Sequence, residues 1–516
     1  MLSPSQGVLT FVKGVSNRLP GSSPTQALLV GALVGFLAYV LTRKRYRLPP
    51  GPWAWPLVGN LSLTRDDQEA FYVKLRRLAV ERYGPVITVH LGTVRCVTLN
   101  SVEVITEALV HKGADFAGRP YQHSLHEMTD GCKNVAFADY GPGWKLRRKL
   151  ALQAIRHYMR GAQMENAVHE VVAVTADKML AEPGAFDPKG YTSLLMFRIL
   201  DSILFGQTKP RDCPPLEQVM DVFDQFAKES EERFLEDVVP LVRFCPTPRF
   251  RRAMKVMDQF IDYIRKNIEE HRKSFSPDNI RDLTDSILLA QIEAARADGK
   301  ETMEQFSDSH VVQTIFDILA AGIDTSRTTL HWALLFLAGH PKVQTRMQAE
   351  IDAATGPRLP QLADKPNLPY CEATLYEVMR LSPVAPTSLP HNTMCDTTVG
   401  GYDVPKNTLV LVNLWAAMHD PGKWEQPEEF KPERFLDAEG QLSAKQESWM
   451  PFSTGRRSCI GESVVKPELV LILACLLKTL SVSLAPGQEY RVTTRFVSLF
   501  LNPPLPYSIA VTPRNK

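Results

Sequence analysis

The sequence predicts a mainly α-helical protein with a small β portion, built as one large domain behind an N-terminal membrane segment. Long stretches at 144–204 and 309–340 place apolar residues at helical spacing. Strand-like patterns are short and confined to 84–110, 397–414 and the end of the chain. With 516 residues, of which 44% are hydrophobic, the chain is long enough to bury a large core.

The first half of the chain alternates between turns and helices. Residues 84–110 contain two β-like runs, GPVITVHLG and RCVTLN. The helical pattern at 144–204 is interrupted by a loop near EPGAFDPKG. Two more helical segments flank a proline-rich stretch at 240–248, and the residues at 249–272 form a basic, amphipathic helix pattern.

The second half contains the longest helix pattern, at 309–340, followed by another at 370–381. Residues 397–414 favour strands around the turn GGYDVP. A last helix is expected after Cys459. Pro467 falls inside that helix, where a proline removes one hydrogen bond at a cost of about 3 kcal/mol, so we expect a local kink beyond the cysteine loop.

Charge and cysteine content exclude several classes of protein. The formal net charge is only +2, which gives no support to a nucleic-acid-binding role. The eight cysteines form no CxxC pair and no regular spacing. A chain of this length does not need a disulfide framework, so seven of the eight are expected to be buried, reduced thiols.

The start of the chain predicts a membrane anchor. We divide the chain into an N-terminal segment at 1–24, an uncharged apolar segment at 25–42, a basic and proline-rich linker at 43–56, and one large domain at 57–516. An 18-residue helix would reach roughly 27 Å, enough for a thin bilayer. Basic residues follow at once, which predicts that the domain faces the cytosol from the endoplasmic reticulum membrane. A cleaved signal and a mitochondrial transit peptide are the alternatives.

The most informative segment is Phe452-Ser-Thr-Gly455-Arg-Arg457-Ser-Cys459-Ile-Gly461. Gly455 permits a turn that a side chain would block, and Gly461 allows the backbone to approach a flat partner. The helix after Cys459 directs N–H groups at the thiol, which favours its ionised form. A thiolate of this kind can ligate haem iron and promote O–O cleavage.

This segment resembles the haem-binding signature of the cytochrome P-450 family at every defining position. The resemblance extends from PPGPWAWPLVGN to the C-terminal strands. It implies the cytochrome P-450 fold, with a long central helix over haem b and Cys459 as the iron ligand. It also implies that Phe452, Arg457 and Gly461 contact the cofactor.

Other motifs agree with the resemblance. Trp144 and Arg148 fit the pattern WxxxR, which places both at the haem edge with Arg148 on a propionate. His391 aligns with another propionate contact of the family, although an ordinary core or surface histidine is an open alternative. Glu377 and Arg380 resemble the family's ExxR, and Arg434 its partner, which together form a structural network under the haem.

The segment Ala321-Gly-Ile-Asp324-Thr325-Ser lies in the middle of the long helix. Glycine and threonine are poor choices for a helix interior. The Thr325 hydroxyl can bond to the preceding turn and open a groove, and Asp324 with Thr325 can pass protons to oxygen bound there. A threonine that only caps its own backbone is the alternative. The acid–alcohol pair favours O₂ activation over a haem-thiolate isomerase or dehydratase.

By resemblance, the substrate pocket is mostly apolar and suits a flat, lipophilic compound that partitions into membranes. The chain is most similar to the branch that holds steroid 17α-hydroxylase/17,20-lyase and the aryl hydrocarbon hydroxylases. SPVAPTSLPHNT favours a steroid-like substrate, while PPGPWAWPLVGN leaves a polycyclic aromatic or xenobiotic substrate open. Each pocket residue could equally belong to the core. The residues assigned to the pocket are Phe116, Ala321, Val384, Ala385 and Val497.

The implied reaction is RH + O₂ + two electrons + two protons → ROH + H₂O. The electrons are expected from NADPH through a membrane-bound flavoprotein reductase, with cytochrome b5 as a further partner. Lys145, Arg147 and Arg456 are expected near the thiolate side, where they would attract an acidic partner, although each could be a plain surface charge. A non-catalytic haem sensor or carrier is the third class of function left open.

Overall fold

The computed structural model of the chain describes residues 46–64, 69–159, 163–206, 210, 214–229, 234–298, 304–492 and 501–514. By its contacts the chain divides into Met1–Leu48 and Pro49–Lys516, and the second of these holds all the elements that follow. The expected membrane segment at 25–42 lies outside the described residues. Within the described ranges, none of the helices has the length and apolar character needed to cross a bilayer.

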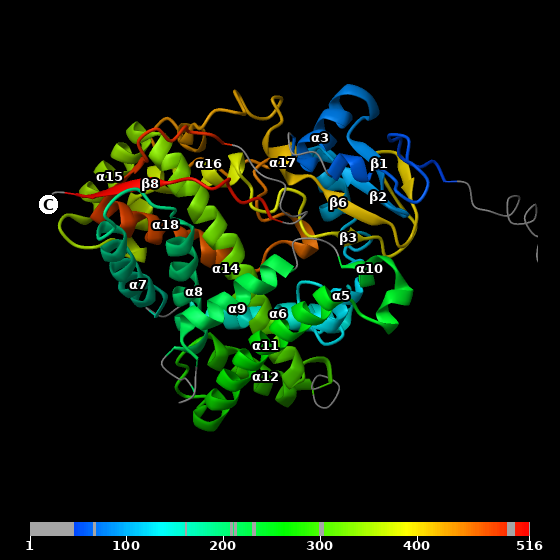
Figure 1. Cartoon of the computed structure of the whole chain (residues 1–516), viewed down its shortest axis with the longest axis horizontal. Helices are drawn as coiled ribbons and strands as arrows, with labels where there is room; N and C mark the ends of the chain where they lie inside the picture. Colours follow the sequence, from blue (N-terminus) through cyan, green and yellow to red (C-terminus); the bar gives the residue numbers. More distant parts are fainter. Residues whose placement is uncertain are drawn as a thin grey trace, which may run out of the picture. The chain divides into compact units, whose positions relative to one another are not determined.

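Helices dominate the unit Pro49–Lys516, which confirms the expected mainly α class (Figure 1). Most of them pack around one large apolar core. The α-helices are α3 (Phe71–Leu78), α4 (Val102–Thr106), α5 (His123–Met128), α6 (Pro142–Tyr158), α7 (Gln163–Leu180), α8 (Lys189–Phe205), α9 (Leu216–Glu229), α10 (Leu235–Val238), α11 (Pro248–Ser274), α12 (Leu283–Asp298), α14 (Asp308–Gly339), α15 (Pro341–Thr355), α16 (Pro369–Leu381), α17 (Leu414–Met418) and α18 (Glu462–Thr479). Short 3-10 or π segments are η1 (Leu61–Thr64), η2 (Ala79–Tyr83), η3 (Glu107–His111), η4 (Pro240–Phe244), η5 (Leu362–Asn367), η6 (Pro432–Phe435) and η7 (Gly455–Arg457).

The long helix α14 passes through the middle of the unit, packed against α8, α11 and α16 (Figure 1). Its 32 residues correspond to a length of roughly 48 Å. Ser307 caps its first turn in a reciprocal pair with the side chain of His310. The sequence pattern had predicted this helix within one residue at each end.

A four-stranded sheet lies at the opposite end of the unit from α7 and α15 (Figure 1). Its order is β1 (Val86–Leu91), β2 (Val94–Leu99), β6 (Leu409–Val412) and β3 (His391–Asn392). The hairpin β1–β2 is antiparallel, β2 pairs with β6 in parallel, and β6 pairs with β3 antiparallel. Two small antiparallel sheets pair β4 (Thr397–Val399) with β5 (Tyr402–Val404), and β7 (Leu480–Leu484) with β8 (Ile509–Pro513).

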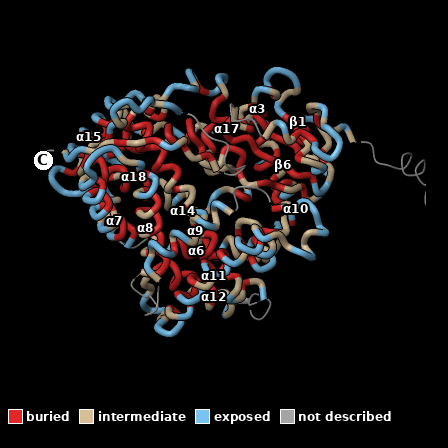
Figure 2. The backbone as a smooth tube through the Cα atoms, viewed as in Figure 1, coloured by how far each residue is buried: buried red, intermediate tan, exposed pale blue. Residues whose placement is uncertain are grey.

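Both faces of the four-stranded sheet are buried, because alternate residues of each strand point to opposite sides. Val97 and Val410 belong to one apolar cluster, while Cys96 and Leu409 belong to another. Buried residues accordingly run through the sheet as well as along α14 and α18 (Figure 2). The sheet is therefore a rigid support for the loops that leave its strands.

Helix α18 continues through Pro467 to Thr479. A proline has no N–H group, so the carbonyl of Ser463, four residues earlier, receives no helical bond from it. From Glu468 to Leu477 every residue of the helix is buried. The proline is thus accommodated between the cysteine loop and the buried body of the helix.

The cysteines correct part of the sequence-based expectation. Seven of them are described, and all seven are free thiols. Cys96, Cys371 and Cys475 are buried as expected. Cys245 and Cys395 are exposed, so the prediction of a buried position was wrong for these two. Both lie in connecting segments, where the sequence carries no periodic pattern that would indicate burial.

Candidate active site

Cys459 lies in the loop between η7 and α18. Its backbone N–H donates to the carbonyl of Phe452 at 3.0 Å, which closes the loop. The N–H of Gly461 points at the Cys459 Sγ, 3.3 Å away. Cys459 is exposed, although Arg457, two residues earlier, is buried. The loop therefore presents one thiol at an accessible surface and holds it with backbone groups.

Gly455 is required by the loop geometry. Its φ of +75° is a left-handed conformation, and a Cβ there would lie 1.9 Å from the carbonyl oxygen of Leu109. Gly461 differs, because its φ of −86° suits any residue and its Cβ would meet only the Cys459 Sγ at 3.7 Å. Neither the backbone conformation nor the described neighbours therefore require a glycine at 461.

The pKa of the Cys459 thiol corrects another expectation. Although the residue keeps accessible surface, the protein atoms packed around it desolvate the thiolate and raise this pKa, and the negative charge of Glu462 adds to the rise. The N–H groups of Gly461 and Glu462 and the charge of Arg148 lower it, as the helix-terminus argument predicted. The pKa of the Cys459 thiol nevertheless lies above its ordinary value. A cation bound to the sulfur would reverse this rise, because a coordinating thiol is deprotonated.

Four nitrogen-rich side chains lie close to this loop and come from segments far apart in the sequence. Burial lowers the pKa of Arg457, and the charges of Arg119 and Arg148 lower it further, while the charge of Asp139 partly offsets this fall. Burial with Arg119 and Arg457 lowers the pKa of His391 to about 3. The effects of these charges on one another and on His391 place Arg119, Arg148, Arg457 and the neutral ring of His391 in one cluster, which we call the cationic cluster.

No member of the cationic cluster forms an ion pair with a carboxylate of the described residues. Arg457 donates to the carbonyls of Ala117 and Ala138, each at 2.7 Å. Arg148 donates to the Ser458 carbonyl at 2.6 Å, and Arg119 to that of Pro390 at 2.6 Å. Guanidinium groups stay charged in proteins, and buried charges need counter-charges. The cluster therefore fits a ligand that carries carboxylates.

Trp144 lies inside the cationic cluster. The Cζ atom of Arg457 is 4.0 Å from the centre of the Trp144 ring, and that of Arg148 is 5.6 Å away. The indole N–H donates to the Val135 carbonyl at 2.9 Å. Trp144 thus orients both arginines with its ring and is itself fixed by its N–H group.

His391 is buried and uses Nδ1 to donate to the carbonyl of Phe116 at 2.8 Å. Because its pKa is low, the ring is neutral and has no second N–H group. Donation to a carboxylate from Nε2 would require the protonated ring, which a nearby anion favours. The structure places His391 in the cluster and leaves its expected role dependent on that anion.

Together the exposed thiol and the cationic cluster fit haem b. The sulfur supplies an axial ligand, and the arginines supply positive charge for two propionates. The donor set therefore agrees with the cofactor that the sequence implied. Arg119 was missed by the sequence analysis, because it lies in a loop with no periodic pattern and outside every motif.

Glu377, Arg380 and Arg434 form a buried network. Arg380 contacts the Glu377 carboxylate through Nε at 2.7 Å and Nη2 at 2.9 Å. Arg434 Nε reaches Glu377 Oε1 at 3.0 Å. The side chains of Glu377 and Arg380 are 0% exposed. The network connects α16 with η6 and fixes the segment that precedes the cysteine loop.

In the middle of α14, one residue packs closely against α8 and its neighbour is exposed. A Cβ on Gly322 would lie 2.9 Å from Leu200 Cδ1, so a larger residue would require the Leu200 side chain to shift where α8 packs against α14. Ala321, one residue earlier, is exposed although most of the helix around it is buried. Thr325 donates its hydroxyl to the Ala321 carbonyl at 2.7 Å. This is the bond to the preceding turn that the sequence predicted.

The remaining pocket residues differ in their surroundings. Phe116 is 0% exposed and belongs to an apolar cluster on one face of the sheet. Val384 and Ala385 are half-buried, and the Val384 carbonyl accepts from the N–H of Asn502 at 3.0 Å. Val497 lies outside the described residues.

A basic groove of about 420 Å³ opens beside the cysteine loop. It contains five cationic side chains and no acidic one: Lys145, Arg148, Lys149, Arg156 and Arg456. Lys145 and Arg456 were expected on this side. Arg147 was expected there too, but it does not line the groove, and its Nη1 faces the Gln305 carbonyl at 3.5 Å.

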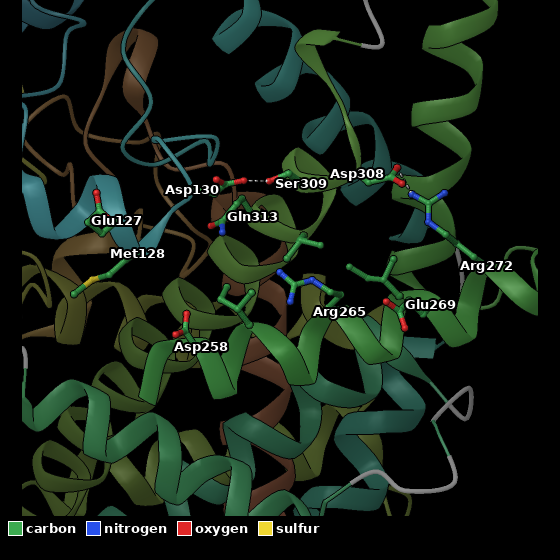
Figure 3. Close-up of a pocket in the computed structure, with 13 residues that line it drawn as sticks. Glu127, Met128, Asp130, Asp258, Arg265, Glu269, Arg272, Asp308, Ser309 and Gln313 are labelled. Carbon is green, nitrogen blue, oxygen red and sulfur yellow. Dashed lines mark hydrogen bonds and ion pairs between the residues drawn. The ribbon is translucent and has the colours of Figure 1, made fainter. Parts of the chain in front are cut away.

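A second groove, of about 440 Å³, is lined by both charged and apolar side chains and lies between α5, α11 and the start of α14 (Figure 3). Asp130 bonds to Ser309 across it, and Arg272 contacts Asp308 at 2.7 Å (Figure 3). None of the residues predicted to act on the cofactor lines this groove. It is therefore not the site formed around Cys459.

Comparison with known proteins gives consistent similarities. The profile of a family described as Cytochrome P450 matches residues 49–511. Cytochrome P450 1A1 of Cavia porcellus is 34% identical over 464 residues, which cover 87% of this chain and 89% of that protein. Cytochrome P450 1A2 of Homo sapiens is 33% identical over 492 residues, covering 91% and 94%. A solved structure titled "Zebra fish cytochrome P450 another structure with Progesterone" has a TM-score of 0.76 and 32% identity, covering 86% of this chain and 99% of that one.

Proposed function

Since this chain belongs to the cytochrome P450 family and is a monooxygenase, we propose that Cys459 ligates the haem iron. We also propose that the enzyme hydroxylates a lipophilic, steroid-like substrate. The single observation that carries the proposal is the exposed Cys459 Sγ, held by the Gly461 N–H at 3.3 Å beside buried arginines that have no described carboxylate partner. Haem iron with a cysteine ligand supplies the chemistry that splits O₂.

The overall reaction is RH + O₂ + two electrons + two protons → ROH + H₂O. Asp324 and Thr325 are the residues that we assign to the proton supply. In the structure the Thr325 hydroxyl is bonded to Ala321, so it must rotate away from that carbonyl to donate a proton elsewhere. Replacing Thr325 by Ala should therefore increase the fraction of NADPH that ends in hydrogen peroxide instead of product.

We assign the basic groove to the electron donor, an NADPH-dependent flavoprotein reductase with an acidic surface, or cytochrome b5. The groove contains five cations and reaches the cysteine loop through Arg148, which bonds to Ser458. Like-signed charges of this kind accelerate association with an oppositely charged partner. Lys149→Glu should slow reduction by the reductase, most strongly at low ionic strength, without changing substrate affinity.

The steroid-like class is supported by the neighbouring structure that holds progesterone and by the motif SPVAPTSLPHNT. Ala321, Val384 and Ala385 supply small apolar surfaces that suit a flat ring system. A polycyclic aromatic or xenobiotic compound is the second candidate, supported by the motif PPGPWAWPLVGN that the sequence shares with the aryl hydrocarbon branch. Spectral titration with steroids and with polycyclic aromatics would separate the two classes.

We further propose that the protein acts at the endoplasmic reticulum membrane. Large apolar side chains are exposed on α10 and η4, where Leu241 is 78% and Phe244 is 89% exposed. Near the start of the described chain, Trp53 and Trp55 are 68% and 64% exposed. Exposed aromatic and aliphatic groups of this size are typical of surfaces that contact membranes.

The decisive experiment combines Cys459→Ser with a turnover assay. The wild-type protein should give the carbon-monoxide difference band of a thiolate-ligated haem, and Cys459→Ser should lose it. Cys245→Ser, which replaces an exposed thiol outside the loop, is the matched control and should keep the band. Product that forms from a steroid without NADPH or reductase would instead favour an isomerase or dehydratase.

A further inference from the structure

Arg327 lies one helical turn after Asp324 on α14, between two carboxylates. Its Nη2 atom is 2.7 Å from Asp324 Oδ1, and its Nη1 atom is 2.7 Å from Asp224 Oδ1 on α9. The side chains of Arg327 and Asp324 are 14% and 21% exposed, and that of Asp224 is 44% exposed. One guanidinium therefore serves two acids that belong to different helices.

The two contacts of Arg327 are not equivalent. Towards Asp224 the guanidinium donates a well-directed hydrogen bond. Towards Asp324 the guanidinium is equally close, at 2.7 Å, but it is poorly directed, and the buried Asp324 Oδ1 accepts no well-aligned hydrogen bond from a described residue. The ring of Phe223 on α9, 5.7 Å from Cζ, also holds the guanidinium near α9, and Ser193 on α8 lies 3.4 Å from Nη1.

The charges around Asp324 favour a carboxyl that can hold a proton. Burial and the charge of Asp224 raise its pKa, while Arg327 lowers it. The element α8 contributes the uncharged Ser193 at this point. Farther along α14, His331 is affected by Arg327 and by Asp187 and Lys189, which precede or begin α8. Two carboxylates thus share one guanidinium, and removing either contact changes how strongly the positive charge of Arg327 acts on Asp324.

We propose that Arg327 is a positioning residue that makes proton delivery by Asp324 depend on the position of α9, because Asp224 and Asp324 compete for one guanidinium. With α9 placed as in the structure, Asp224 and Asp324 share the charge of Arg327, and Asp324 can take up and release a proton. When α9 moves away, Arg327 turns to Asp324 and holds it ionised. A substrate that fixes α9 would thereby permit proton delivery. The inference rests on the proposed function, because it requires Asp324 to supply protons.

The first test measures Asp324 directly and needs neither reductase nor NADPH. The infrared band of the protonated carboxyl is followed against pH in the resting holoprotein and is assigned by its loss in Asp324→Asn. In Asp224→Asn the midpoint should fall by about one pH unit, since the full charge of Arg327 then acts on Asp324. In Arg327→Gln it should rise. Asp221→Asn, which replaces an exposed acid on the same helix, should leave it unchanged.

The second test measures coupling. Asp224→Asn should produce several-fold more hydrogen peroxide per NADPH than the wild-type protein. In the double variant Asp224→Asn/Arg327→Gln the peroxide yield should equal that of Arg327→Gln alone, because Asp224 acts only through Arg327. A purely structural role would give additive effects of the two substitutions.

The outcomes distinguish the inference from the proposed function. If the wild-type protein hydroxylates its substrate but the infrared midpoint is the same in all variants, the role of Arg327 is overturned and the proposed function stands. A shifted midpoint with an unchanged peroxide yield also overturns that role. If the wild-type protein forms no hydroxylated product from any substrate with reductase, the proposed function and the role of Arg327 both fail.

Discussion

The guanidinium of Arg457 stacks on the indole ring of Trp144, with its Cζ atom 4.0 Å from the ring centre. This contact joins the cysteine loop to α6. It also places a buried positive charge two residues from Cys459, next to Arg119 and Arg148, which repel it. A protein retains such an arrangement when a bound anion compensates the charge, because an uncompensated buried charge is strongly destabilising.

Arg457→Gln should reduce the affinity for haem. The substitution removes the charge that we assign to a propionate, and a hydrogen bond to a charged group contributes about 1.5–3 kcal/mol, so haem should dissociate roughly ten- to a hundredfold faster. Transfer of haem to an acceptor protein measures the rate. Arg456→Gln is the matched control, because Arg456 is the adjacent but exposed arginine and donates to Tyr140. Equal haem loss from both variants would contradict the assignment.

Gly455→Ala should abolish stable haem binding. The new Cβ would lie 1.9 Å from the Leu109 carbonyl oxygen, so the cysteine loop must move. Gly487→Ala separates this clash from backbone strain, since Gly487 has a similar φ of +79° but no atom near its Cβ position. The control should lose only about 1 kcal/mol of stability. Haem content per protein and the free energy of unfolding would be compared for the two variants.

Glu377→Gln should destabilise the fold by about 3–5 kcal/mol, because it leaves Arg380 buried with its charge uncompensated. The control Glu433→Gln removes an acid that is 46% exposed and paired with Arg346. Surface pairs of that kind contribute about 0–1 kcal/mol. Urea unfolding of the two variants gives both values. A loss below 1 kcal/mol for Glu377→Gln would refute a stabilising role of the network.

The buried carboxyl of Glu468 should make the free energy of unfolding depend on pH. Burial raises the pKa of its carboxyl from 4.5 to about 8, and its Oε1 atom has no hydrogen-bond partner among the described residues. Between these two pH values the folded protein binds the proton and the unfolded chain does not, so stability falls as pH rises. The slope is on the order of 1 kcal/mol per pH unit.

Glu468→Gln should therefore gain stability over the wild-type protein at pH 8 and gain much less at pH 5. Thermal unfolding at the two pH values, with haem content held constant, measures the difference. If the two proteins show parallel pH profiles between pH 5 and pH 8, the carboxyl does not titrate in the folded state as inferred.

Local patterns predicted much of this structure. The apolar spacing located α14 and α16 almost to the residue, because long amphipathic or buried helices impose a strong period on the sequence. The turn at Gly455 also followed from residue type alone, since its left-handed backbone favours glycine. These features depend on interactions between neighbours in the chain.

Features that depend on tertiary contacts could not be predicted in this way. Arg119 joins the cationic cluster from a loop, and its position carries no periodic signal and belongs to no motif. The direction of the Cys459 pKa depends on burial, which outweighs the N–H groups that the sequence indicated. The contact of Arg327 with Asp224 joins residues about 100 positions apart. Each of these needed the fold before it could be recognised.

The parallel pairing of β2 with β6 has a consequence for biosynthesis. Cys96–Leu99 and Leu409–Val412 are partners, so the ribosome must make roughly 300 more residues before the second strand exists. At about 5–20 residues per second, the hairpin β1–β2 waits on the order of 15–60 s with one edge unpaired. An unpaired apolar edge is a site of aggregation, which makes this interval the one in which a chaperone would matter most.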